Sequence, residues 1–396
     1  MERSSPGRIF LVFLKLGCTS FGGPVAHIGY FREEFVRRRQ WFDERAYADL
    51  VALCQFLPGP SSSQVGMSVG ISQAGIARAI AAWIGFTLPS ALLMLTFAFG
   101  VVAAGDTLGS GWLQGLKVMA VAVVANAVWA MARGLCPDRP RQIIAVLAAI
   151  LVAAWPQSLS HLVTIAAGAV LGRLILSAEG TGTATPMKLP IGRRTGTTAL
   201  ILFFILLIGL PVAVRVVPEI GLAVFDSFFR AGSLVFGGGH VLLPLLQGHV
   251  VPPGWLDVDG FMAGYGAAQA VPGPLFSVAA YMGAVMTPGG GLAMAGIALL
   301  AIFLPSFLLV IGALPFWNML RAQPNVQSAL MGVNAAVVGL LVAVLYDPVW
   351  TGTMHTPGDF VLLLLSFAAI ALLNVPMWIV APAAALIGAA FATIGF

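Results

Sequence analysis

Charge is what this sequence has least of. Charged residues make up 9% of the 396 residues and hydrophobic residues 59%, whereas an ordinary soluble domain carries about 25% charged residues. Fifteen acids and twenty bases are too few to cover a folded chain of this size. The proportions exclude a soluble globular protein, a disordered chain and, despite the net charge of +5, a nucleic-acid-binding protein. The chain must present its apolar surface to a lipid bilayer.

Cysteine is scarce as well. Cys18, Cys54 and Cys136 provide no disulfide framework, and the five histidines are scattered. The sequence contains no CxxC, HExxH or Walker A motif, which are patterns of metal, redox or nucleotide sites. Histidines, cysteines and acids do not gather at a spacing that a catalytic centre would need. We therefore expect no metal, no cofactor and no catalytic residue, and we do not expect an enzyme.

Long apolar runs are what the sequence has in place of charge. A helix that crosses a bilayer needs about 17–25 apolar residues. Nine stretches reach or approach that length: 79–104, 113–132, 142–156, 159–176, 198–217, 291–316, 326–346, 358–374 and 376–396.

Four further apolar stretches are interrupted in the middle by glycine and proline: residues 9–31, 47–75, 219–247 and 261–287. Non-helical backbone at membrane depth persists only where protein or a water-filled cavity satisfies its polar groups. These stretches are therefore predicted to be broken or re-entrant helices inside the bundle.

The two halves of the chain repeat one another. The string QFLPGP at residues 55–60 matches QAVPGP at 269–274, an offset of 214 residues from 55 to 269. The strings FGG at 21–23 and LPS at 88–90 likewise match FGG at 236–238 and LPS at 304–306. Several blocks in one order, with offsets that drift by only two residues, indicate a duplicated module.

Charge gives the two copies opposite orientations. The loop that follows the first broken segment is rich in arginine, whereas its counterpart at 248–260 contains no Lys or Arg and carries Asp257 and Asp259. Lys and Arg accumulate in cytoplasmic loops, so the two loops are expected on opposite membrane faces. We expect an all-α polytopic membrane protein of two inverted-topology repeats, 1–176 and 218–396. Between them, residues 177–217 form a basic cytoplasmic linker and one linking transmembrane helix.

Inverted repeats with broken helices are typical of secondary transporters, which bind substrate near the bilayer midplane. Free N–H groups at the N-terminus of a half-helix attract anions. Each Pro-Gly-Pro here is preceded by glutamine and followed by serine. The alternative is a proline kink that only aids packing, with the glutamines as hydrogen-bonding glue. The expected substrate-binding residues are Gln55, Gly59, Ser61, Ser62, Ser63 and Gln64, and in the second copy Gln269, Gly273 and Ser277.

Buried cations indicate that the ligand is an anion. Lys15 and Arg230 each precede a Phe-Gly-Gly by six residues. Because a charge in hydrocarbon needs a partner, we include both among the expected substrate-binding residues. For Arg230 the alternative partner is Asp226, four residues earlier on the same helix face. Lys15 alternatively extends its long side chain to water, and Lys117, which also lies in a span, has the same two interpretations.

The glycine clusters and their neighbours complete the predicted site. Gly22, Gly23, Gly237, Gly238 and His240 are added to the substrate-binding residues. Candidates for carrying a coupling proton are His27, Asp49 and Asp226, since histidine titrates near neutral pH. A histidine inside a membrane protein is alternatively a packed hydrogen-bonding residue.

These motifs carry a family resemblance. With FGGP at 21–24, the arginine-rich loop, Trp41 and QFLPGPSSSQ at 55–64, and with FGGGH at 236–240 and the second PGP, the chain resembles the chromate ion transporter (CHR) family in its long, two-domain form. The resemblance covers essentially the whole chain. It implies export of chromate, a sulfate-like dianion, across the bacterial inner membrane, and chromate resistance driven by the electrochemical gradient rather than by ATP.

Two alternatives stay open. The same fold could take up sulfate or another oxyanion, because chromate and sulfate share charge and shape, and an anion channel would use the same donors along a continuous pore. The second copy has Gly239 in place of Pro24 and Leu275-Phe276 in place of Ser61-Ser62, so the first half is expected to supply more polar donors. A homodimer is compatible with the sequence, although nothing in it argues for one.

Overall fold

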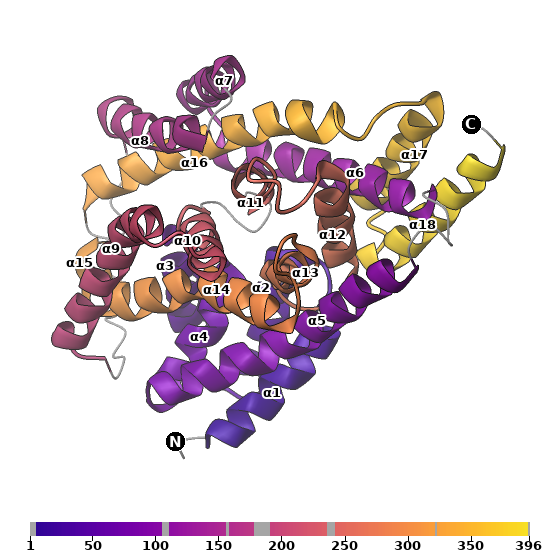
Figure 1. The fold of residues 1–396 in the computed structure, drawn as a ribbon. Helices are drawn as coiled ribbons and strands as arrows, with labels where there is room; N and C mark the ends of the chain where they lie inside the picture. The colour runs from indigo at the N-terminus through magenta and orange to yellow at the C-terminus, as the bar shows by residue number, and fades with distance from the viewer. Residues whose placement is uncertain are drawn as a thin grey trace.

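The computed structural model describes residues 5–104, 111–155, 158–177, 191–235, 242–320 and 323–394. Every regular element within these ranges is a helix, which confirms the predicted all-α class. Figure 1 shows the helices crossing one another at many angles rather than forming one parallel bundle. Five of them are long and apolar enough to span a membrane: Ile76–Gly100, Gly111–Leu135, Arg193–Val216, Leu292–Phe316 and Pro324–Trp350.

The first half of the chain runs through eight α-helices and one π-helical turn. They are α1 (Pro6–Thr19), α2 (Gly23–Arg32), η1 (Glu33–Arg38), α3 (Glu44–Phe56), α4 (Ser61–Ala74), α5 (Ile76–Ala104), α6 (Gly111–Leu135), α7 (Arg139–Ala154) and α8 (Ser158–Ile175). The single helix α9 (Arg193–Val216) then leads to the second half.

The second half repeats this order with more interruptions. Its elements are α10 (Ile220–Ser233), α11 (Leu242–Val250), α12 (Val258–Ala270), η4 (Leu275–Ser277), α13 (Val278–Val285), α14 (Leu292–Ala313), η5 (Leu314–Phe316), α15 (Trp317–Leu320), α16 (Pro324–Val344), η6 (Leu345–Trp350), α17 (Pro357–Phe367), η7 (Ala368–Leu372) and α18 (Met377–Ile394). The elements α10, α12, α14 and α16 correspond to α1, α3, α5 and α6.

The helix before each Pro-Gly-Pro begins and ends in the same way in both halves. Asp43 caps α3 by accepting the Ala46 N–H at 2.7 Å, and Asp257 caps α12 by accepting the Gly260 N–H at 2.7 Å. Both helices then end two residues before a proline, because the residue preceding proline is pushed out of the helical region. The predicted breaks in 47–75 and 261–287 are therefore confirmed.

The two halves exchange partners at their ends. Helix α6 of the first half packs against α17 and α18 of the second, and α16 of the second half packs against α7 and α8 of the first. Glycines permit the close approach: a methyl group on Gly115 would collide with the Ala384 carbonyl, and one on Gly332 with the Gly168 carbonyl. This reciprocal packing is what two inverted-topology repeats, joined by α9, produce.

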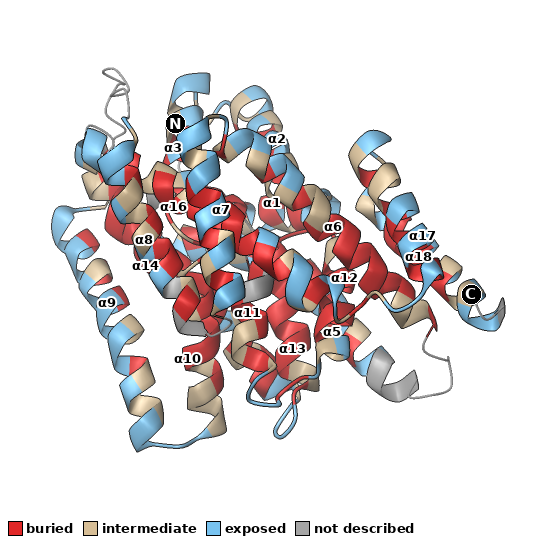
Figure 2. Ribbon diagram, turned by 90° about the horizontal axis from the view of Figure 1, so that it is seen from above, coloured by how far each residue is buried: buried red, intermediate tan, exposed pale blue. Residues whose placement is uncertain are grey.

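The linking helix α9 differs from the other long helices in its burial. Only 17% of its most apolar window is buried, against 72% for the window in Leu292–Phe316. Figure 2 shows α9 at the edge of the molecule with a largely exposed surface, while the crossing helices in the middle are buried. Exposed Ile205, Ile208 and Val212 on α9 are suited to contact with lipid.

The arginine-rich loop is largely neutralised by its own acids. Arg32 pairs with Glu44 at 2.8 Å, Arg39 with Glu34 at 2.7 Å, and Arg37 with Glu33 at 3.5 Å. The exposed Arg32–Glu44 and Arg37–Glu33 pairs contribute little stability. The loop therefore carries much less excess positive charge than its arginine count suggests.

Candidate functional site

The two Pro-Gly-Pro turns lie at the interface between the repeats and bond to it reciprocally. The N–H of Gly59 donates to the Val235 carbonyl at 2.6 Å, and the N–H of Gly273 donates to the Ser20 carbonyl at 2.9 Å. Ser20 and Val235 each follow the first helix of the opposite repeat. The main chains of the two broken helices are thus joined across the interface.

Each glycine also packs against the Leu-Pro-Ser string of the other repeat. A Cβ on Gly59 would lie 2.5 Å from the Oγ of Ser306, and a Cβ on Gly273 would lie 3.1 Å from the Oγ of Ser90. Both glycines have positive φ, 122° and 91°, a conformation that L side chains rarely adopt. The turns therefore require glycine for conformation and for space.

The first turn ends in a buried helix N-terminus. Ser61, Ser62 and Ser63 are 8%, 2% and 2% exposed and form the first turn of α4. The first hydrogen bond within α4 runs from the Gln64 N–H to the Pro60 carbonyl, at 2.9 Å. The main-chain N–H groups of the three serines therefore have no acceptor within the helix. Such an end carries partial positive charge and binds anions.

His27 connects this helix N-terminus with the second turn. Its Nε2 lies 3.2 Å from the Ser20 carbonyl and its Nδ1 lies 3.3 Å from the Ser62 Oγ. Because a carbonyl can only accept, Nε2 carries the proton in the neutral ring and Nδ1 accepts from the Ser62 hydroxyl. The Ser20 carbonyl thus accepts two hydrogen bonds, one from His27 Nε2 and one from the Gly273 N–H.

Several buried polar groups around the two turns have no hydrogen-bond partner among the described residues. Buried polar groups are normally paired, so each unpaired one calls for an explanation. The Nε2 of Gln64 closes the first turn by donating to the Pro58 carbonyl at 2.7 Å, which leaves its carbonyl oxygen free. The unpaired atoms are the hydroxyls of Ser20, Ser63, Thr87, Ser277 and Ser306 and the Oε1 of Gln64.

The two matched cations have different surroundings. Arg230 binds Asp226 through two hydrogen bonds, of 2.9 and 2.6 Å, so the ion-pair alternative for Arg230 is present. The Asp226 side chain is 4% exposed and that of Arg230 is 30% exposed. Lys15, in contrast, is exposed on α1.

Other predicted residues lie farther from this arrangement or outside the described ranges. Asp49 accepts from the Nε1 of Trp317 at 3.1 Å, a contact between the repeats. Gln55 is exposed and Gln269 is half-buried, while Gly22 and Gly23 form the left-handed turn that begins α2. Gly237, Gly238 and His240 lie outside the described residues.

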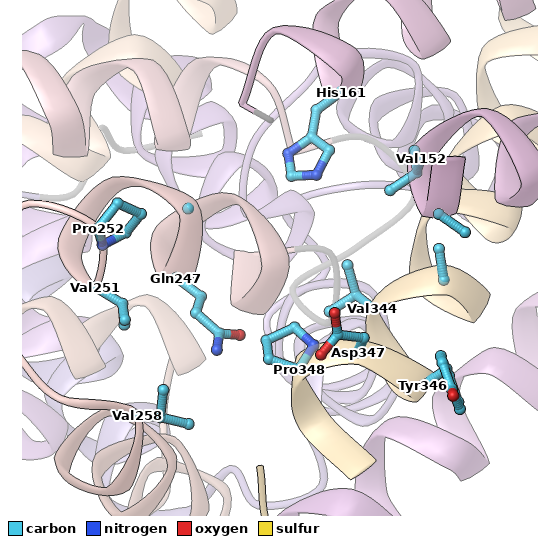
Figure 3. Close-up of a pocket in the computed structure, with 13 residues that line it drawn as sticks. Val152, His161, Gln247, Val251, Pro252, Val258, Val344, Tyr346, Asp347 and Pro348 are labelled. Carbon is cyan, nitrogen blue, oxygen red and sulfur yellow. The ribbon is translucent and has the colours of Figure 1, made fainter. Parts of the chain in front are cut away.

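Sequence reasoning missed the residues that back each turn from the opposite repeat. Ser90 and Ser306 belong to the repeated Leu-Pro-Ser string, which was a detectable signal, whereas Ser20 and Thr87 had none. A separate cavity of about 360 Å³ was also missed. Figure 3 shows His161, Gln247 and Asp347, from three different elements, facing this space.

The long apolar helices and the two repeats are those of a multi-pass membrane protein. The model of the family described as "Chromate transporter" matches the chain twice, at residues 7–173 and 222–389. The chain therefore belongs to the chromate transporter family, and each half of it matches the family model.

Individual relatives agree with this assignment. The chain is 29% identical over 347 residues to a chromate transport protein of Pseudomonas aeruginosa, covering 86% of this chain and 80% of that protein. It is 28% identical over 351 residues to an uncharacterised transporter of Methanocaldococcus jannaschii (87% and 85% covered), and 26% identical over 343 residues to a chromate transport protein of Cupriavidus metallidurans (84% and 80%). No solved structure matches the chain significantly.

Proposed function

We propose that this protein is a secondary active transporter that exports chromate, a sulfate-like divalent oxyanion, across the bacterial inner membrane. The single observation that supports this most is the pair of reciprocal Pro-Gly-Pro turns, surrounded by unpaired buried hydroxyls, at the interface of the repeats. An interface between inverted repeats is where alternating-access transporters hold their substrate.

The chemistry of the proposed site suits a tetrahedral oxyanion. Hydroxyls of Ser63, Ser277 and Ser306 and the free amides at the start of α4 all act as hydrogen-bond donors. Hydrogen bonds to a charged acceptor are roughly twice as strong as neutral ones, and the α4 N-terminus adds the field of its dipole. A dianion can therefore be bound without a dedicated cation, in keeping with the pairing of Arg230 to Asp226.

The proposal assigns the coupling role first to His27. Of the three candidates, Asp226 is paired with Arg230 and Asp49 accepts from Trp317. His27 alone bonds to both the α4 N-terminus and the chain segment that holds the second turn. Protonation of its Nδ1 would turn the Ser62 hydroxyl towards accepting, and so would change the donors that face the substrate. The electrochemical gradient, rather than ATP, supplies the energy in this proposal.

Flux into proteoliposomes tests the function. Labelled chromate is presented with and without an imposed membrane potential or pH gradient, and sulfate is added as a competitor. The proposal expects saturable chromate movement that depends on the gradient. Flux that never saturates would identify a channel instead, preferential sulfate movement in the inward direction would identify an uptake transporter, and absence of any oxyanion flux would contradict the proposal.

A further inference from the structure

A polar cavity, separate from the Pro-Gly-Pro turns, opens at the N-terminal end of α12. Its volume is about 580 Å³, far above the ~30 Å³ that one water molecule occupies in the liquid. It therefore has room for a hydrated oxyanion. Elements of both repeats line it, and its polar side chains are those of Gln114, Lys117, Asp257, Asp259, Tyr281, His355, Thr356 and Asp359.

An ion pair between the repeats lies in this cavity. The Nζ of Lys117, on α6, is 2.7 Å from the Oδ1 of Asp259, on α12. The two side chains differ sharply in exposure, at 11% for Lys117 and 66% for Asp259. If the pair opens, the Asp259 carboxylate is readily hydrated, whereas the buried ammonium of Lys117 requires another anion to replace it.

The other two carboxylates in the cavity are held by their own helix ends. Asp257 caps α12 through the Gly260 N–H. Asp359 accepts from the Gln114 Nε2 at 3.0 Å and from the main-chain N–H groups of His355 and Thr356. Asp259 is the one of the three whose side-chain partner is an ammonium, and it is therefore the carboxylate that an incoming anion can displace.

The position of the cavity connects it to the substrate site. Helix α12 has its N-terminus at the cavity and ends at Ala270, directly before the second Pro-Gly-Pro turn. Its 13 residues extend over about 20 Å. Lys117 pairs with Asp259 near the N-terminus of α12, so it lies towards the end of this helix that is remote from the second turn.

The structure assigns Lys117 the role of a second anion-binding residue, at which the transported oxyanion displaces the Asp259 carboxylate during its passage through the cavity. This inference rests on the proposed function and extends it from one substrate site to two successive ones. No bond forms or breaks in this step; one ionic partner of the ammonium replaces another. The competing interpretation is a structural salt bridge that only joins α6 to α12.

Kinetics of labelled chromate in proteoliposomes separate the two interpretations. For Lys117→Gln we expect KM for chromate to rise about tenfold or more, with Lys117→Arg retaining most of the affinity. For Asp259→Asn we expect KM to fall or stay unchanged, because the competing carboxylate is gone. A structural salt bridge predicts instead that both neutral variants lose activity together and that the charge swap Lys117→Asp with Asp259→Lys restores it.

Two controls accompany these variants: a second ion pair outside the cavity and a test of folding. Arg141→Gln breaks a pair of the same length, Arg141 to Asp138 at 2.7 Å, away from the cavity, and should leave KM unchanged. Thermal melting in detergent identifies any variant that fails to fold. If Lys117→Gln does not fold, a lower KM for Asp259→Asn supports the inference, and an unchanged KM or a loss of activity contradicts it. Restoration of activity by the charge swap, or an unchanged KM for Lys117→Gln, overturns the inference about Lys117. The proposed function still stands in that case if the wild-type protein carries gradient-dependent chromate flux. A wild-type protein without oxyanion flux overturns the proposed function itself.

Discussion

The two Pro-Gly-Pro turns have the same backbone arrangement but different side chains. Each glycine donates its N–H across the interface, and each packs against a serine of the opposite repeat. After the first turn come three serines and a glutamine at the start of α4, whereas after the second come Leu275 and Phe276 in a short 3-10 helix. The backbone is thus symmetric at the proposed site, whereas the side chains place more of its candidate donors in the first repeat.

The largest expected effect concerns the opposite orientation of the two repeats in the membrane. With Cys18, which is exposed, replaced by Ser, Arg38→Cys should react with an impermeant thiol reagent only from the cytoplasmic side and Asp257→Cys only from the other side. Labelling of right-side-out and inverted vesicles measures this. Reaction of both cysteines from one side would mean that the repeats are not inverted.

Adding a methyl group to the turn glycines comes next in expected effect. Gly59→Ala should abolish transport, because the new Cβ would lie 2.5 Å from the Ser306 Oγ and 2.6 Å from the Gln64 Nε2. The left-handed backbone adds about 1–3 kcal/mol of strain. Gly273→Ala, with its nearest contact at 3.1 Å, should retain some flux.

The matched control for these alanines is Gly29→Ala, whose Cβ has no neighbour within 4 Å. It should transport like the wild type. Equal activity of Gly59→Ala and Gly29→Ala would show that the first turn is not constrained as described.

Removal of single hydroxyls tests the asymmetry of the donors. Ser63→Ala should raise KM for chromate by about ten- to a hundredfold, since a hydrogen bond to a charged group contributes about 1.5–3 kcal/mol. Ser62→Ala should also weaken transport, because it removes the partner of His27. Ser277→Ala is expected to have a smaller effect than either, and equal effects of all three would argue against an asymmetric site.

Breaking the buried ion pair should change stability more than transport affinity. Arg230→Gln leaves Asp226 buried without its partner, which costs up to about 3 kcal/mol. The melting temperature in detergent should fall by several degrees, and Asp226→Asn in the same chain should recover most of the loss. A melting temperature unchanged by Arg230→Gln would show that the pair is not needed for folding.

Lys15→Gln is expected to have the smallest effect. Lys15 matches Arg230 in the repeat but is exposed, so its ammonium already has water or lipid headgroups as partners. Chromate flux should change less than twofold. A loss as large as that of Ser63→Ala would assign Lys15 to the substrate site after all.

Helix content, the breaks at the two Pro-Gly-Pro strings and the repeat could be predicted from the sequence because each depends on a pattern in the sequence. Apolar runs predicted the membrane-spanning helices, prolines predicted where helices break, and the spacing of Asp226 and Arg230 indicated their ion pair. The partners of the turns were not readable, since nothing local shows that Ser306 packs against Gly59 or that the Ser20 carbonyl accepts from Gly273. Likewise, the pairing of Lys117 with Asp259 joins residues 142 positions apart, and the exchange of helices between the halves is a property of the packed structure.

The location of bound chromate is the most direct test of this account. Crystals grown with chromate are measured on both sides of the chromium absorption edge, and the anomalous peaks that appear only above the edge are chromium, because the sulfur signal of methionine and cysteine hardly changes there. A chromium peak is expected between the two Pro-Gly-Pro turns, beside the first turn of α4. A peak confined to the lipid-facing surface, or none near either turn at a saturating chromate concentration, would contradict it.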